Sequence, residues 1–257
     1  MDIFIHRMDK EQFWQIIDEA RQTAGRWQDM YSPLLDTLSK LEPRDIIRWQ
    51  QIFNEYQSLS HTSMLWAAAT VMHKGCSDDS FDYFRAWLTA QGKDVFLQAL
   101  ADPDSLANLE SVQAFGREVL RPESTLPAGY AEATRFKDIL SVAAVAYESV
   151  SESGGNIYSD IGKSPLSIHE QMDISGEVRY ADDMDEKWVG LNLPRDETQL
   201  KLKAAFPNLY RTFNGGEPEK ESPQGKASIM DAIRAGRSAI KAKVVKKKEP
   251  SKDELER

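Results

Sequence analysis

Apolar side chains recur every three or four residues along most of the chain up to residue 151, which is the spacing of amphipathic helices. In the first such segment the recurring positions are Phe13, Ile16, Ile17 and Ala20. Asp9, with Gln12 three residues later, has the arrangement of a helix cap. The pattern therefore predicts a first helix over about residues 10–24.

Capping residues and prolines predict where the next helices begin. Ser32 is expected to cap a helix that starts at Pro33, and Pro43 is expected to begin the helix after it. A buried central helix is expected over residues 62–74, because nearly every position in that segment is apolar. Further helices are predicted from Ser77 to about Gly92 and over residues 93–101, 105–121 and 129–151.

The helical pattern is lost after residue 151. Gly, Ser, Pro and acidic residues dominate from Gly154 to Pro194, so an irregular segment is expected there. Residues 188–193 have the composition of a short strand or a buried loop. A helix over residues 197–209, interrupted at Pro207, is one interpretation of the segment that follows.

These patterns together predict a mainly α protein. The expected organisation is a single multi-helix domain over residues 1–214 with an irregular C-terminal part, followed by a linker over residues 215–226. The linker is rich in Gly, Pro and Glu, which is typical of flexible connections. Residues 227–257 are expected to form a flexible basic tail that contains a short amphipathic helix and is otherwise disordered.

Charge is distributed unevenly between the predicted domain and the tail. The whole chain has a formal charge of -9, whereas residues 217–257 hold 11 Lys+Arg and 8 Asp+Glu, a net charge of +3 that leaves -12 for residues 1–216. An acidic domain repels nucleic acids and anionic membranes at long range. Binding to a polyanion would therefore have to come from the tail.

The predicted tail helix has two different faces. Three interpretations stay open: a solvated tail, a segment that docks on a partner protein, or a segment that contacts nucleic acid or an anionic surface. The candidate docking residues are the aliphatic Ile229, Ile233, Ile240 and Val244 and the basic Arg234, Arg237 and Lys241.

Composition favours a folded protein of the cytoplasm. Hydrophobic residues make up 41% of the chain and aromatic residues 9%, more than a disordered chain would have. The longest apolar run, residues 64–72, is about half as long as a transmembrane helix, and the N-terminus has no signal-peptide pattern. Cys76 is the only cysteine, which fits a reducing compartment.

One group of charged residues stands out around the predicted helix that follows Ser77. Asp78 and Asp82 are four positions apart, and Asp82 and Arg85 are three apart, so these side chains can share one helical face. Two further carboxylates lie near the start of a later helix. The resulting candidate polar site comprises Asp78, Asp79, Asp82, Arg85, Asp102 and Asp104.

Three interpretations of this candidate polar site stay open. In the favoured one, Ser77 caps the helix, and Asp78 and Asp79 complement its dipole. Asp82 then pairs with Arg85 within the helix. The group could instead be a polar patch that binds a protein, or a set of carboxylates that holds a divalent cation for hydrolysis.

Cys76 is a candidate reactive thiol. It lies just before a predicted helix N-terminus, where the helix dipole would stabilise a thiolate, and His73 lies three residues earlier. Gly75 turns the chain between the two, and the sequence identifies no group that would orient the histidine. The favoured interpretation is that Cys76 is a small buried apolar residue.

Motifs of common enzyme classes do not occur in this sequence. It contains no phosphate-binding loop, no dinucleotide-binding glycine pattern, no Gly-x-Ser-x-Gly elbow and no His-Glu-x-x-His pair. The remaining histidines, His6, His61 and His169, are not spaced as metal ligands. No cofactor and no metal are therefore expected.

Two blocks of sequence resemble those of a bacterial protein family. They are Gly75-Cys-Ser-Asp-Asp-Ser-Phe81 and Ala101-Asp-Pro-Asp-Ser-Leu106, with Phe13-Trp-Gln-Ile-Ile-Asp18 upstream. Over about residues 9–190 the chain resembles the domain-of-unknown-function 4240 family. The resemblance implies a shared fold and no particular activity.

The sequence favours a non-enzymatic protein-interaction or regulatory module over two alternatives. The first alternative is a metal-dependent hydrolase that uses the acidic residues at 78–82 and 102–104. The second is a nucleic-acid-associated protein that acts through the basic tail.

Overall fold

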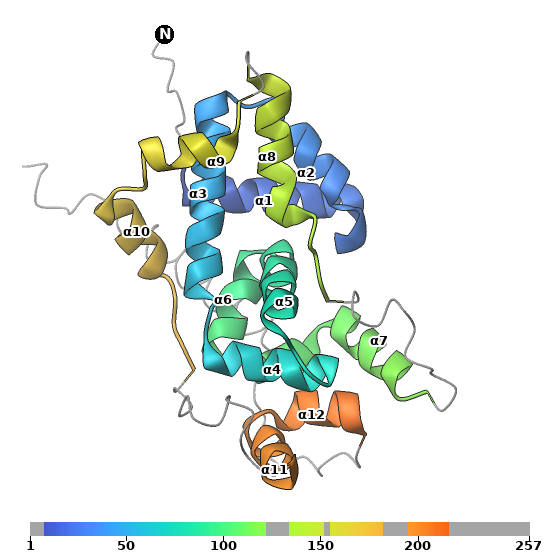
Figure 1. The fold of residues 1–257 in the computed structure, drawn as a ribbon. Helices are drawn as coiled ribbons and strands as arrows, with labels where there is room; N and C mark the ends of the chain where they lie inside the picture. The colour runs from blue at the N-terminus through green and yellow to red at the C-terminus, as the bar shows by residue number, and fades with distance from the viewer. Residues whose placement is uncertain (1–7, 122–133, 152–154, 182–194, 216–257) are drawn as a thin grey trace, which may run out of the picture. The chain divides into compact units, whose positions relative to one another are not determined.

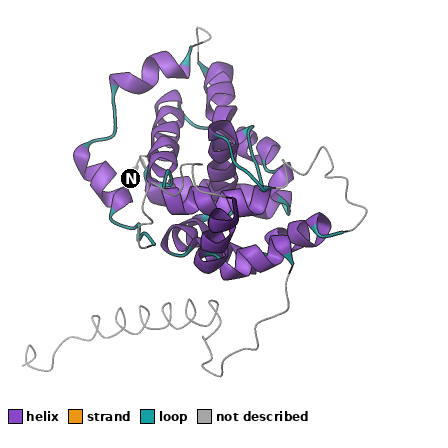
Figure 2. Cartoon of the chain, turned by 60° about the horizontal axis from the view of Figure 1, so that its bottom comes forward, coloured by secondary structure: helices purple, strands orange, loops and turns teal. Residues whose placement is uncertain are grey.

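A computed structural model of the chain describes residues 8–121, 134–151, 155–181 and 195–215. The chain divides into two units, Met1–Gly216 and Glu217–Arg257, and every described residue belongs to the first. These residues form helices and loops, with no strand among them (Figure 2). The prediction of a mainly α protein is confirmed.

Eight α-helices occupy the described residues up to residue 151 (Figure 1). They are α1 (Lys10–Ala24), α2 (Tyr31–Leu38), α3 (Pro43–Leu59), α4 (Ser63–His73), α5 (Asp78–Ala90), α6 (Lys93–Ala101), α7 (Glu110–Val119) and α8 (Ile139–Val150). The later α-helices are α9 (Ile157–Asp160), α10 (Ile168–Ser175), α11 (Arg195–Ala205) and α12 (Pro207–Asn214). The 3-10 turns are η1 (Trp27–Asp29), η2 (Pro103–Asn108) and η4 (Ile161–Lys163).

Local capping explains where several of these helices begin and end. The Asp9 side chain accepts a hydrogen bond from the backbone of Gln12 at the start of α1, and Gly25 ends that helix with φ 70°. Thr62 and Ser77 cap α4 and α5 in the same way. The predicted bounds of α1, α4, α5 and α6 therefore agree closely with the structure.

The core forms where α3 packs against α1, α5 and α8, and where α2 packs against α1 and α8. Helix α3 runs between α8 and α10, with α1 crossing behind it (Figure 1). Phe13 of α1 stacks on Tyr56 of α3 with ring centroids 5.5 Å apart, and Trp49 stacks on Phe53 at 5.5 Å. Because these rings are almost fully buried, α3 is a fixed platform for whatever its outer face carries.

Three predicted helix starts are wrong. Helix α2 begins at Tyr31 with Met30 before it, so Ser32 lies inside the helix and caps nothing. The segment predicted as one helix over 105–121 is the 3-10 turn η2 followed by α7. In the turn that begins at Pro103 the backbone hydrogen bonds join residues three apart, whereas in an α-helix they join residues four apart. Helix α8 begins at Ile139, and residues 129–133 of the longer predicted helix lie outside the described part.

The prediction of an irregular segment from Gly154 to Pro194 is also wrong in part. It contains α9, η4 and α10, each too short to produce a clear apolar period. Helix α10 begins at a capping box in which Ser167 and Glu170 satisfy each other's backbone amides. Residues 188–193 lie outside the described part, and Pro207 does interrupt the last helical stretch, where it begins α12.

No helix in the described ranges combines the length and the apolar composition that crossing a bilayer requires. The predicted linker from residue 216 onward and the whole predicted tail lie outside those ranges.

Candidate functional site

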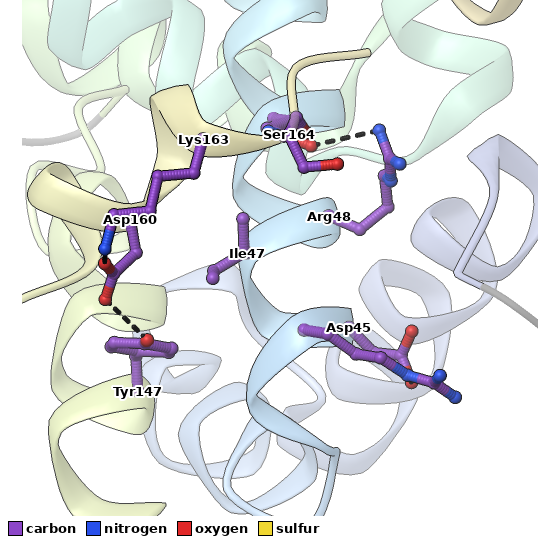
Figure 3. Close-up of a pocket in the computed structure, with 9 residues that line it drawn as sticks. Asp45, Ile47, Arg48, Tyr147, Asp160, Lys163 and Ser164 are labelled. Atoms are coloured by element: carbon purple, nitrogen blue, oxygen red, sulfur yellow. Dashed lines mark hydrogen bonds and ion pairs between the residues drawn. The ribbon is translucent and has the colours of Figure 1, made fainter. Parts of the chain in front are cut away.

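A cavity of about 780 Å³ opens between α3, α8 and the short elements α9 and η4. Its volume falls in the range of small-molecule sites, roughly 300–1,000 Å³. Figure 3 shows Tyr147, Asp160 and Lys163 on one side of it and Arg48 and Asp45 on the other. The residues that line it are Arg44, Asp45, Ile47, Arg48, Gln51, Tyr147, Asp160, Lys163 and Ser164.

Gln51 fastens the wall of this cavity to α3. Its amide nitrogen donates to the carbonyl oxygens of Ile161 at 2.7 Å and Ser164 at 2.8 Å. Its amide oxygen accepts a hydrogen bond of 3.1 Å from Nη1 of Arg48. One buried amide therefore holds the η4 segment in place and orients the arginine beside it.

Arg48 is a buried cation, with only 8% of its side chain exposed. Its Nη1 atom lies 3.7 Å from a carboxylate oxygen of Glu170, which is longer than a good charge-assisted hydrogen bond. That carboxylate also accepts hydrogen bonds from the backbone nitrogen and the hydroxyl of Ser167, at 2.8 and 2.6 Å. Arg48 thus joins the cavity to the first turn of α10.

The opposite wall is a cluster of three polar groups. The Tyr147 hydroxyl donates to Oδ2 of Asp160 at 2.7 Å, and Lys163 forms an ion pair with Oδ1. Hydrogen bonds from Lys163 and then from Tyr147 lower the pKa of Asp160. The same bond to Asp160 raises the pKa of Tyr147. Asp160 is therefore a charged acceptor that already has two partners.

The residues that line the cavity carry more positive than negative charge, and Glu170, outside the lining, pairs with Arg48. Arg44, Arg48 and Lys163 contribute three positive charges, whereas Asp45 and Asp160 contribute two negative ones. Of the two carboxylates, Asp160 is paired with Lys163, and Asp45 lies 3.7 Å from Arg44. The lining therefore carries a net charge of +1 in a chain whose formal charge is -9.

Helix α10 presents an exposed apolar surface next to this cavity. Ile168 and Met172 are 74% and 64% exposed and lie one turn apart, so their side chains share a face. On its other side α10 buries Ile174. Large apolar side chains that neighbour each other in water are typical of interaction surfaces. We call Ile168 and Met172 the α10 face.

The candidate polar site predicted around α5 separates into two parts in the structure. Asp78 and Asp79 are exposed in the first turn of α5, and Asp82 forms an ion pair with Arg85. Arg85 is buried, donates to the carbonyl oxygen of Gln57 and lies 5.0 Å from the centre of the Phe81 ring. These contacts are those of helix capping and of a tie between α5 and α3.

Asp104 belongs to a different contact, at the start of α12. Its carboxylate accepts hydrogen bonds from the backbone nitrogens of Asn208 and Leu209, at 3.1 and 2.8 Å, and from the Asn208 side chain at 2.7 Å. Asp102 is exposed just before η2. Across the described ranges, no three His, Cys, Asp or Glu side chains are placed to hold a metal ion. The metal-site interpretation of these residues stays a prediction.

Cys76 and His73 have separate surroundings. His73 is buried and its Nε2 atom lies 2.6 Å from Oγ1 of Thr134, whereas the Cys76 thiol donates weakly to the Ser77 carbonyl oxygen. Burial lowers the pKa of His73 to about 3 and raises the pKa of Cys76 to about 11. A thiol with this pKa is protonated at neutral pH, and burial is the largest cause of the shift.

The candidate docking residues of the tail, from Ile229 to Val244, lie outside the described residues and stay predictions. The sequence interpretation missed the cavity, although one signal for it was present. Arg44, Arg48 and Gln51 recur at helical spacing and form a polar stripe opposite the apolar side of α3. Nothing in the spacing of Tyr147, Asp160 and Lys163 indicates that they meet this stripe.

Comparison with known proteins identifies the family and nothing more specific. No curated protein and no solved structure gives a significant match to the chain. A family model with the description "Protein of unknown function (DUF4240)" matches residues 8–149, a span that ends sooner than the predicted resemblance to about residue 190. Because this match covers more than half of the sequence, the chain belongs to the DUF4240 family.

Proposed function

We propose that the chain is a non-enzymatic protein-interaction module that binds a partner protein on the α10 face. The observation that carries this proposal is the exposure of Ile168 and Met172 one turn apart on the same helix. Burying such side chains against a partner removes apolar area from water, which is the main favourable term in most protein association.

Helix α10 is held firmly enough to act as a preformed binding element. Lys10 of α1 forms ion pairs with Asp173 at 2.7 Å and with Glu177 at 2.9 Å. Lys93 at the start of α6 also pairs with Glu177 at 2.9 Å. A helix that is fixed before binding loses less conformational entropy when the partner arrives.

The charges on α10 indicate what kind of surface would fit. Glu170 and Asp173 lie beside the α10 face in sequence, and the side chain of Asp173 is 65% exposed. A partner with an apolar patch and basic residues around it would complement both features. We therefore favour a partner surface of that chemistry.

The test compares three forms of the full chain as bait in a lysate of the source organism. Met172→Asp places a charge in the α10 face, and Leu200→Asp makes the same change at a side chain of α11 that is 69% exposed. The proposal predicts that the wild type and Leu200→Asp capture the same partner and that Met172→Asp loses it. Circular dichroism first checks that the wild type and both variants are folded. Equal capture of the partner by the three proteins, or no saturable capture by the wild type, would overturn the proposal.

A further inference from the structure

We propose that the cavity between α3, α8 and η4 binds a small oxyanion, a phosphate or carboxylate group, through Arg48 with Arg44 and Lys163. This inference is independent of the α10 face, since it concerns a different surface and a different kind of ligand. It starts from the position of one buried charge.

A buried guanidinium normally requires an anionic partner at close range, because removing a cation from water without compensation is costly. In the described part of the chain, both contacts of Arg48 use the single nitrogen Nη1: one with the neutral amide of Gln51, the other with Glu170 at 3.7 Å. A guanidinium has five N–H donors in a planar fork. Arg48 is thus a cation that Gln51 holds in orientation, with its ion-pair partner Glu170 beyond hydrogen-bond distance.

The lining of the cavity favours an anion over a cation or a neutral ligand. Of its two carboxylates, Asp160 is held by Lys163 and Tyr147, and Asp45 has Arg44 beside it. Arg48 has its carboxylate partner Glu170 at 3.7 Å, and that carboxylate also accepts two hydrogen bonds from Ser167. An oxyanion placed against it would accept two parallel hydrogen bonds, which is the geometry that arginine favours with carboxylate and phosphate groups.

The supporting groups are arranged as a binding site requires. Gln51 accepts a hydrogen bond from Arg48 and donates to the carbonyl oxygens of Ile161 and Ser164, which flank Lys163 in the chain. Arg44 lies one turn before Arg48 on α3, lines the same cavity, and has a side chain that is 64% exposed. The cavity has room for more than the oxyanion itself, so the group it binds could belong to a larger metabolite.

Isothermal titration calorimetry of the full chain with sodium phosphate and with sodium succinate, against sodium chloride at equal ionic strength, tests this inference. We expect saturable binding of one of the two oxyanions and none of chloride. Phosphate binding alone identifies a phosphate site, and succinate binding alone identifies a carboxylate site. Absence of binding by both would overturn the inference.

Variants then locate the site. Because truncating one partner of a buried charge pair leaves the other partner uncompensated, Arg48→Gln should weaken binding by about tenfold or more. Arg44→Gln should weaken binding less than Arg48→Gln does. If Arg48→Gln does not fold, Arg44→Gln still tests whether the cavity is the binding site. Arg26→Gln is the matched control, since the side chain of Arg26 is 72% exposed and pairs with Asp29 on another part of the surface. Unchanged affinity in both cavity variants, or equal loss in the control, would contradict the assignment.

Discussion

Asp104 of η2 caps α12 from a distant part of the chain: its carboxylate accepts hydrogen bonds from the backbone nitrogens of both Asn208 and Leu209. The residue before α12 is Phe206, which has no side-chain acceptor to offer. Pro207 occupies the first position of the helix and has no N–H of its own. The next two amides therefore depend on Asp104, which is 8% exposed.

We expect Asp104→Ala to lower the free energy of unfolding by about 2–3 kcal/mol, because it leaves two amides and the Asn208 side chain without their charged acceptor. Asp104→Asn keeps an acceptor oxygen and should cost less. Urea denaturation measures both values. The exposed Asp102→Ala is the control, with an expected change within about 0.5 kcal/mol. Similar losses at the two positions would show that Asp104 does not cap α12.

Gly116 of α7 allows α7 to lie close to α12. A Cβ atom built on it would lie 2.6 Å from the backbone oxygen of Thr212, closer than packed atoms approach. Replacing a helical glycine with alanine usually stabilises a helix by about 1 kcal/mol. Here we expect Gly116→Ala to destabilise the protein by about 1–2 kcal/mol, because overpacking costs more than the helix gains.

Thermal unfolding of Gly116→Ala beside Gly162→Ala checks this expectation. Gly162 has open space around its Cβ position, so alanine should be tolerated there. A higher melting temperature for Gly116→Ala than for the wild type would show that α7 and α12 are not in close contact.

His73 makes the stability of the protein dependent on pH. Its folded pKa of about 3 lies below its ordinary value of 6.5, chiefly because of burial and secondarily because of Arg135. Between these two values the unfolded chain binds the proton more readily, so this group lowers stability as pH falls from 6.5. The slope from one such group is at most about 1.4 kcal/mol per pH unit.

We expect His73→Gln to show a smaller loss of stability than the wild type between pH 7 and pH 5. Glutamine can still reach Thr134, and carboxylates that titrate in the same window contribute equally to both proteins. The difference between the two urea denaturation series isolates the histidine. Parallel series would show that His73 is protonated as easily in the folded protein as in the unfolded chain.

Lys163 and Tyr147 contribute unequally to the pKa of Asp160. Because the hydrogen bond from Lys163 is the larger cause of the lowered pKa, Lys163→Met should raise this pKa more than Tyr147→Phe does. Carbon-detected NMR titration of the Asp160 carboxyl group measures both changes. A larger rise of the Asp160 pKa in Tyr147→Phe than in Lys163→Met would show that the tyrosine lowers this pKa more than the lysine does.

The sequence was sufficient where structure depends on neighbouring residues. The starts of α1, α4 and α5 were predictable because Asp9, Thr62 and Ser77 cap their own helices. Helix α10 was missed because its apolar positions are few, although its Ser167 and Glu170 capping box can be read from the chain. That capping box is the feature of the sequence that indicates where α10 begins.

The candidate site could not be predicted, because it depends on contacts between distant residues. Gln51 donates hydrogen bonds to the carbonyl oxygens of Ile161 and Ser164. Because every residue has a backbone carbonyl, the sequence does not indicate which of them accept these bonds. Asp104 was predicted to belong to one polar site with Asp78 and Asp82, whereas its hydrogen-bond partners lie on α12, far away in the sequence. Burial raises the pKa of Cys76, a direction opposite to the one that its position before a helix would favour.

Hydrogen exchange of the full chain, alone and bound to the captured partner, tests the proposed interaction most directly. If the α10 face is the binding surface, backbone amides from Ile168 to Ser175 will exchange more slowly in the complex than in the free chain. Protection should be absent at α11, where Leu200 is similarly exposed. A saturated complex in which α10 exchanges at its free rate would contradict the proposal.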